Sequence, residues 1–278
     1  MELSLDLFSM EGCTVYDVII IGAGPAGNLA ALKLSTRGHK VFVVDSRNDI
    51  GNKLCTGIIG SECASHFPPD TSIIHHTASA ATVVSPAGKK YRIATQNPQA
   101  HVIDRVAYVA SFAHQAMNAG AEYLLGSRVT NIEISDQKAT VRTKSKAGRG
   151  LYQAKMAIIA SGFGSPLLGM VGLTKAGASN HMVGIQAEVE TNELKETEVY
   201  LGEEISPGSF GWLTPLSGSR ALIGIASRKR LKGHMDRFTS TLRMKGRVRE
   251  IIKEPRQWGI PIRPLHKTYA SRVLVAGD

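Results

Sequence analysis

Residues 15–27 read VYDVIIIGAGPAG and join an apolar stretch to a glycine-rich turn. Val15 to Ile21 is almost wholly apolar and rich in β-branched residues, which is typical of a strand buried on both faces of a parallel sheet. Pro25 to Arg37 follows with apolar residues at helical spacing and ends before Gly38, so the pattern predicts a helix. Lys40 to Asp45 is a second apolar stretch that closes on an acid. Strand, turn, helix and strand within about 30 residues predict one βαβ unit.

The turn of this unit has the spacing GxGxxG. Gly22 permits the tight turn, Gly24 lets the backbone approach a pyrophosphate, and Gly27 lets the helix pack close to the strand. The phosphates would then meet unpaired N–H groups at the positive end of the helix. An acid about 20 residues further on accepts hydrogen bonds from ribose hydroxyls and disfavours NADP. Dinucleotide binding is therefore predicted for Gly22, Gly24, Pro25, Ala26, Gly27 and Asp45, the alternative being a loop that only turns the chain.

Length and composition limit the class of protein. The chain has 278 residues, of which 43% are apolar and 20% charged, so it can bury a core in one large or two small domains and is not disordered. Three cysteines, Cys13, Cys55 and Cys63, are too few for a disulfide framework, which favours a reducing compartment. No run of 18 apolar residues is present, and the first residues carry acids where a signal peptide carries bases. We therefore expect a cytoplasmic protein.

The net charge of +10 favours an anionic partner, which could be nucleic acid, anionic lipid, or a phosphorylated cofactor or substrate. Nine basic residues and one acid lie between Arg228 and Arg249, around a predicted helix from Gly233 to Met244. This stretch favours docking to an anionic membrane or binding of a substrate phosphate, the alternative being a solvated basic face. No nucleic-acid module is visible, so we expect no nucleic-acid partner. The histidines, including His75 and His76, lack the spacing of metal ligands, so no metal site is predicted.

The rest of the chain mixes helical and antiparallel signals. Two short strands around Pro86-Ala87-Gly88 predict a β-hairpin, and a helix is predicted from Asp104 to Gly120. Further strands are predicted at 122–125, 129–135, 139–143, 152–160, 181–190, 197–201, 211–213, 221–226 and 273–276. Because α/β signals bracket the antiparallel ones, we predict an α/β fold with two interleaved domains. A Rossmann-type dinucleotide-binding domain would contain residues 15–79, 98–180 and 270–278. An antiparallel-sheet substrate domain would contain residues 80–97 and 181–269. Residues 1–14 would be an N-terminal extension.

Two later segments indicate which dinucleotide the chain binds. Residues 156–165, MAIIASGFGS, and 272–278, RVLVAGD, are both strands that end in small-residue turns. With the first motif, they resemble the large FAD-dependent family that includes aromatic hydroxylases and geranylgeranyl reductases. The resemblance implies that the first motif holds the ADP half of FAD and that a central A-D-G-x-x-S turn lies near the cofactor. Here that turn keeps Gly162 but has Ser161 in place of the usual aspartate. The terminal Gly277-Asp278 matches the G-D pair whose aspartate binds the ribityl chain.

The geranylgeranyl reductase branch of this family is the most similar. Residues 53–60, KLCTGIIG, resemble its C-G-G motif, and residues 207–215, PGSFGWLTP, resemble its Y-x-W-x-F-P motif. The resemblance implies that Cys55 donates a proton or gates the flavin face. Phe210 and Trp212 alternate on one face of a predicted strand, where we expect their flat rings to line a channel for an isoprenoid chain. Arg105 matches the family's arginine near the flavin. A cation at the start of a helix is disfavoured by the helix dipole, so Arg105 also indicates an external anionic partner such as a flavin phosphate. The alternatives are an inert buried thiol, ordinary core packing of the two rings, and an exposed arginine without a ligand.

The resemblance implies an FAD-dependent oxidoreductase that reduces carbon–carbon double bonds of a polyprenyl group, with NAD(P)H or reduced ferredoxin as electron donor. Its expected partners are a polyprenyl lipid or prenylated small molecule and, through peripheral contact, an anionic membrane. An FAD-dependent monooxygenase or halogenase, and an electron-transfer flavoprotein without a prenyl substrate, are the alternatives. Because the chain ends at Asp278 inside a motif that the family continues, we also expect that a C-terminal part is missing.

Overall fold

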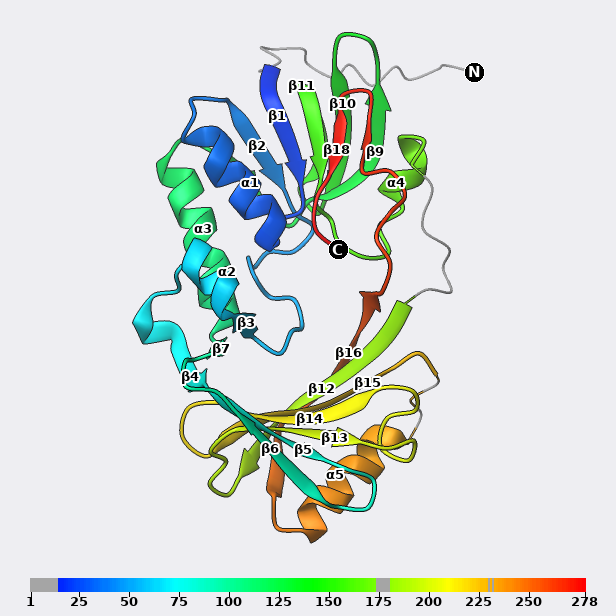
Figure 1. The fold of residues 1–278 in the computed structure, drawn as a ribbon. Coiled ribbons are helices and arrows are strands. Elements are labelled where there is room, and N and C mark those ends of the chain that lie inside the picture. Colours follow the sequence, from blue (N-terminus) through cyan, green and yellow to red (C-terminus); the bar gives the residue numbers. More distant parts are fainter. Residues whose placement is uncertain (1–14, 174–180, 230, 232) are drawn as a thin grey trace. The chain divides into compact units, whose positions relative to one another are not determined.

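The structure is a computed structural model that describes residues 15–173, 181–229, 231 and 233–278. The predicted N-terminal extension, residues 1–14, and with it Cys13, lies outside the described residues. Within the described ranges, the chain forms two compact units (Figure 1). The first contains residues 15–50, 112–173 and 265–277, and the second contains residues 51–111, 181–229, 231, 233–264 and 278. Both units are discontinuous in sequence.

The first unit is built on an eight-stranded sheet with a parallel centre. The apolar segment β1 (Val15–Ile21) pairs in parallel with β2 (Val41–Val44) and with β11 (Gly148–Ile159), because its residues are buried on both faces. Parallel pairing continues from β2 to β8 (Glu122–Leu124) and from β11 to β18 (Val273–Val275), while β17 (Tyr269–Ala270) adds an antiparallel edge. The predicted βαβ unit is confirmed: α1 (Pro25–Ser35) connects β1 to β2.

Different layers cover the two faces of this sheet. On one face lie α1 and the end of α3 (Arg105–Asn118) (Figure 1). They enclose a core that includes Ala31, Val43 and Ala116. On the other face β9 (Arg128–Ile134) and β10 (Ala139–Ser145) form an antiparallel meander with the first half of β11. The helix α4 (Leu167–Met170) packs there too, around Phe42, Ile132 and Leu167. The carboxyl ends of β1, β2 and β11 remain the place where loops meet.

The second unit contains a seven-stranded sheet. Its strands are, in spatial order, β16 (Val248–Pro261), β12 (His181–Thr191), β15 (Arg220–Ser227), β14 (Phe210–Pro215), β13 (Thr197–Leu201), β5 (Ala80–Val84) and β6 (Lys90–Ala94). All neighbours are antiparallel except β13 and β5, and the predicted hairpin of β5 and β6 is confirmed. The helix α5 (His234–Met244) lies on one face of this sheet (Figure 1). Its residues Phe238 and Leu242 pack there in one core with Leu213 and Ile225.

A three-stranded sheet completes the second unit. It consists of β3 (Ile58–Gly60), β7 (Ala100–Ile103) and β4 (Ile74–Ala78), with α2 (Ser61–His66) and the short 3-10 helix η1 (Thr71–Ile73) between β3 and β4. Asp104 caps α3 as predicted, because its Oδ1 accepts the N–H of Ala107 at 3.0 Å. This cap fixes the start of the helix next to β7.

The three-stranded sheet and α2 were not predicted from the sequence, and two further features of the fold also differ from the expectation. The strand β16 was not predicted, because Arg249, Lys253 and Arg256 interrupt its apolar pattern. It is an edge strand, where charged side chains oppose pairing with another chain. The unit boundaries also differ from the predicted domain boundaries, since residues 51–79 and 98–111 group with the antiparallel sheet.

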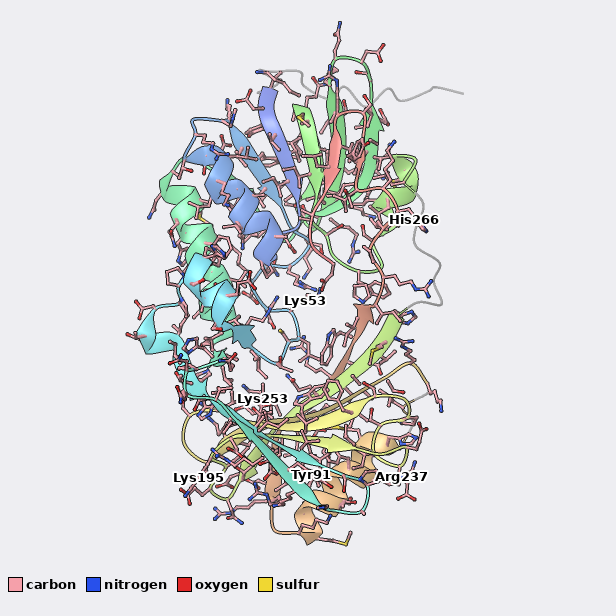
Figure 2. All side chains as sticks on the ribbon, viewed as in Figure 1. Lys53, Tyr91, Lys195, Arg237, Lys253 and His266 are labelled. Atoms are coloured by element: carbon pink, nitrogen blue, oxygen red, sulfur yellow. The ribbon has the colours of Figure 1, made fainter. Side chains whose placement is uncertain are left out.

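The packing of α5 gives a test of this fold. We expect Phe238→Ala to lower the free energy of unfolding by about 3–5 kcal/mol, because the ring is 1% exposed and its removal leaves a cavity in the core. Urea unfolding followed by circular dichroism measures the change. Arg237→Ala, one residue earlier on the exposed side of the same helix (Figure 2), is the control and should change stability by less than about 0.5 kcal/mol. Equal effects of the two substitutions would contradict the packing.

Candidate active site

The GxGxxG turn is shaped by close contacts that leave no room for side chains at two of its glycines. Gly22 has φ +113°, and a Cβ placed on it would lie 2.4 Å from the carbonyl oxygen of Ala160. A Cβ on Gly27 would lie 1.9 Å from the carbonyl oxygen of Gly22. At Gly24, by contrast, an added Cβ would meet nothing within 4 Å. The turn therefore combines a tightly packed base with an open side at Gly24, which fits a backbone cradle for the pyrophosphate of a dinucleotide.

Asp45 connects the loops that follow β1 and β2. Its Oδ2 accepts the N–H of Ala23 at 2.7 Å, and its Oδ1 accepts the N–H of Arg47 at 2.8 Å. Sequence analysis assigned this carboxylate to ribose hydroxyls and missed its bonds to the protein backbone. Each carboxylate oxygen has a second lone pair, so ribose binding remains a prediction that these contacts allow.

The three segments assigned to FAD meet at the carboxyl ends of the parallel strands. The N–H of Ala160 donates to the carbonyl oxygen of Ile21 at 2.8 Å, so the turn that contains Gly162 starts beside the first motif. A Cβ on Gly277 would lie 3.1 Å from Cβ of Ala26, at the start of α1. This edge is where ligands bind in open parallel sheets.

A cavity of about 280 Å³ lies at this edge, within the first unit. Gly22, Asp45 and Ser161 contribute to its wall, together with Arg47 and Arg128. The two guanidinium groups favour an anionic ligand such as a nucleotide. Sequence reasoning did not find these arginines, because neither belongs to a motif and Arg128 simply begins β9.

In the second unit, Arg105 contacts protein carbonyl groups. Its Nη1 donates to the carbonyl oxygen of Gly51 at 2.7 Å and to that of Lys53 at 2.9 Å. The guanidinium group of Arg105 therefore holds the loop that leads to Cys55. The sequence analysis interpreted Arg105 as a ligand of an external phosphate and did not predict these contacts with the protein backbone.

Asp278, a predicted cofactor residue, forms an ion pair in the structure. Its Oδ2 lies 3.8 Å from Nζ of Lys53 (Lys53 is labelled in Figure 2).

The loop with Cys55 is also tied to the seven-stranded sheet. Nε2 of Gln186, on β12, donates to the carbonyl oxygen of Cys55 at 3.0 Å. Gln186 is opposite Gly224 of β15, which is opposite Trp212 of β14, so Gln186 and Trp212 lie on one face of the sheet. We call this face, opposite the one that packs on α5, the tryptophan face.

The Cys55 residue is exposed, which contradicts the alternative of a buried inert thiol.

Two indole rings lie flat against glycines on the tryptophan face. A Cβ on Gly224 would lie 2.2 Å from Cζ2 of Trp212, and a Cβ on Gly184 would lie 2.8 Å from Cη2 of Trp258. The two ring centroids are 6.4 Å apart and the ring planes are inclined by 73°. Phe210 extends this aromatic surface, with its centroid 6.1 Å from that of Trp212. Phe210 and Trp212 thus share one face as expected, whereas Trp258 was missed because it lies in the unpredicted strand β16.

Three buried polar atoms on the tryptophan face have no hydrogen-bond partner among the described residues. They are Nε1 of Trp212, Oγ1 of Thr214 and Oε1 of Gln186. Thr214 follows Trp212 by two residues on β14, which puts it on the same face. A buried polar atom without a partner destabilises the fold by about 1–3 kcal/mol. The tryptophan face therefore combines a cluster of aromatic rings with buried polar atoms that lack a partner among the described residues.

Comparisons with known proteins identify the family. Residues 16–199 match the pyridine nucleotide-disulphide oxidoreductase family. A digeranylgeranylglycerophospholipid reductase of Methanoculleus marisnigri is 30% identical over 95% of this chain and 69% of the relative. The chain belongs to the FAD-dependent geranylgeranyl reductase family. The enzyme of the same name from Methanocaldococcus jannaschii is 26% identical over 95% of this chain and 70% of its own.

A solved structure agrees with this assignment at the level of the fold. The geranylgeranyl bacteriochlorophyll reductase-like protein of Thermoplasma acidophilum has a TM-score of 0.84, with 23% identity, over 95% of this chain and 70% of that protein. The predicted α/β class with a Rossmann-type part and an antiparallel sheet is confirmed, as is the class of FAD-dependent oxidoreductase. The individual site residues remain predictions.

The contact between Gly224 and Trp212 can be tested directly. We expect Gly224→Ala to destabilise the protein by about 1–3 kcal/mol, because the new methyl group would lie 2.2 Å from the Trp212 ring and 2.8 Å from the carbonyl oxygen of Ile185. Urea unfolding gives the stability, and tryptophan fluorescence reports the displaced ring. Gly169→Ala, in α4 with nothing within 4 Å of the added Cβ, is the control and should not destabilise. An unshifted fluorescence spectrum with unchanged stability in Gly224→Ala would refute the contact.

Proposed function

We propose that this FAD-dependent oxidoreductase reduces carbon–carbon double bonds of geranylgeranyl groups carried by an anionic glycerolipid. The observation that carries the proposal is the tryptophan face, where Trp212 and Trp258 form an aromatic surface next to the tethered Cys55 loop. Isoprenoid chains are flat at each alkene and apolar throughout, so they fit such a surface. The names of the related enzymes support the same substrate class.

The residues of the first unit fit FAD in this proposal. The open side at Gly24 and the N-terminus of α1 would take the pyrophosphate, Asp45 the ribose, and Arg47 with Arg128 would favour the anionic cofactor. Pro25 begins the helix without an N–H that would need a partner. When bound and reduced, FAD supplies a hydride to the alkene.

The residues of the second unit would then orient the alkene and provide the proton. Trp212, Trp258 and Phe210 would hold the chain flat and exclude water from it, which an isolated alkene requires because it is a poor hydride acceptor. The Cys55 thiol would donate the proton to the carbon that does not receive the hydride. Arg105 and Gln186 act through the backbone of the Cys55 loop and keep it in place.

The proton-donor role of Cys55 can be tested with Cys63 as a control, because both cysteines are exposed. FAD-loaded protein is reduced anaerobically with dithionite and mixed with a digeranylgeranyl glycerophospholipid, and mass spectrometry follows the two hydrogen atoms gained by each saturated double bond. We expect Cys55→Ser to slow turnover by about 10²-fold or more, because the hydroxyl is a much weaker acid than the thiol. Cys63→Ser, another exposed cysteine eight residues further on, should retain wild-type turnover.

Two outcomes would contradict the proposal. Wild-type turnover in Cys55→Ser would remove the thiol from the reaction. Oxygen uptake with a hydroxylated product would instead identify a monooxygenase. Repeating the assay with NADH, NADPH or reduced ferredoxin in place of dithionite identifies the donor, which we propose to be one of these carriers.

Contact with an anionic membrane is the second part of the proposal. Within the described ranges, no helix is long and apolar enough to span a bilayer. Among the described basic residues of 228–249, three form ion pairs with acids outside that segment, namely Lys229 with Glu203, Arg247 with Glu198 and Arg249 with Glu190. Acids from other segments therefore neutralise part of the positive charge that the sequence of this segment implied. Arg237 and Arg243 stay exposed on α5, and Met244 between Arg243 and Lys245 is 82% exposed.

Membrane contact is tested with vesicles. We expect the protein to sediment with phosphatidylglycerol vesicles and not with phosphatidylcholine vesicles, and to be released by salt. Arg237→Glu should weaken binding more than about fivefold, since each basic residue near the surface contributes about 1 kcal/mol. Lys195→Glu reverses a charge away from α5 (both residues are labelled in Figure 2) and serves as the control. Equal loss in the two variants would exclude α5 as the contact.

A further inference from the structure

Asn28 is a fully buried polar residue inside α1, directly after the last glycine of the GxGxxG turn. A buried amide is tolerated only where its hydrogen-bonding groups are paired. Nδ2 of Asn28 donates to the carbonyl oxygen of Ala23 at 3.0 Å. On its other side, the hydroxyl of Tyr123, on β8, donates to Oδ1 of Asn28 at 3.1 Å. Asn28 therefore links the edge of the sheet to the backbone of the glycine turn.

The bond to Ala23 fixes the direction of the next N–H group. The carbonyl group of Ala23 and the N–H of Gly24 belong to one planar trans peptide unit, in which they point in opposite directions. Since the carbonyl oxygen is held by Asn28, the N–H of Gly24 is turned away from Asn28. The N–H of Ala23 is held separately by Asp45 at 2.7 Å. Both peptide units around Ala23 are thus fixed by side chains in a turn whose glycines would otherwise be flexible.

Tyr123 decides which end of the Asn28 amide faces Ala23. A carbonyl oxygen can only accept, so it requires the NH₂ end of the amide, and the oxygen end then needs a donor. The Tyr123 hydroxyl is that donor, and burial raises the pKa of Tyr123 well above its usual value, so it stays protonated at physiological pH. The relay runs from Tyr123 through Asn28 to Ala23 without an ionisable step.

We infer that Asn28 is a positioning residue for FAD, which presets the N–H of Gly24 as a donor to the cofactor's pyrophosphate. Presetting a donor removes the cost of ordering the turn when the ligand binds. The inference rests on FAD binding and is independent of the lipid substrate. A purely structural role predicts only a loss of stability when Asn28 is replaced. Ser35 gives the comparison, since it is also buried in α1 and its hydroxyl donates to the carbonyl oxygen of Ala31 at 2.7 Å.

The test measures FAD affinity by fluorescence titration of the cofactor-free protein, together with the melting temperature. In Asn28→Asp the ionised carboxylate cannot donate to Ala23, so we expect FAD to bind about tenfold or more weakly at pH 8. Protonation restores a donor, and burial raises the pKa of the introduced carboxyl group, so affinity should recover as the pH falls toward 5, relative to the wild type at each pH. Tyr123→Phe should weaken binding severalfold without recovery at low pH. Ser35→Ala should lower the melting temperature and leave FAD affinity unchanged.

Several results would overturn the inference. Unchanged FAD affinity in Asn28→Asp, or a loss that does not depend on pH, would leave Asn28 with a structural role. If Asn28→Asp does not fold, Tyr123→Phe decides, and wild-type affinity in that variant excludes the relay. Wild-type protein that binds FAD but does not reduce the lipid contradicts the proposed reaction and leaves this inference intact.

Discussion

The constraint on which the cofactor site depends is the close approach of three backbone segments at the end of β1. A Cβ on Gly27 would lie 1.9 Å from the carbonyl oxygen of Gly22, and one on Gly22 would lie 2.4 Å from that of Ala160. Helix α1, strand β1 and the turn after β11 can therefore meet only because glycines stand at these points. This packing fixes where α1 begins, and with it the direction of the N–H groups that we predict to bind a dinucleotide. The parallel pairing of β11 with β18 then brings Gly277 to the same helix end.

The sequence predicted most reliably what local rules decide. The strand β1, helix α1 and strand β2 follow from a buried apolar stretch, a GxGxxG turn and a second apolar stretch, all adjacent in the chain. What depends on tertiary contacts was not predictable from these patterns. Arg105 looked like a ligand because it begins a helix, but its partners are carbonyl groups about 50 residues earlier in the chain. Gln186 and Trp258 belong to no motif, and only the register of β12, β15 and β16 shows that they lie on the face of Trp212.

The two units support their sites in different ways. In the first, the candidate site is made of backbone groups whose directions are set by side chains, since the half-buried Asp45 and the buried Asn28 hold the peptide groups on either side of Ala23. In the second, it is made of side chains laid across strands, and the glycines at 184 and 224 provide the room. The first arrangement suits an anionic ligand, which backbone N–H groups bind well. The second suits a flat apolar ligand, whose affinity comes from area and shape.

The unpartnered atoms of the tryptophan face bear on whether these rings are core packing or a binding surface. If Trp212 served packing alone, a phenylalanine would fill much of the space without a buried N–H that lacks a partner. Trp212 also requires glycine at 224, and the intrinsic backbone preference of glycine inside a strand is about 0.5–1 kcal/mol less favourable than that of alanine where no ring occupies the space. The sheet combines both costs with Oγ1 of Thr214 and Oε1 of Gln186, which are buried and have no hydrogen-bond partner in the part of the chain that the structure describes, so it is not optimised for stability. Such local departures from the most stable choice are expected at functional sites, which favours a ligand surface over ordinary core packing.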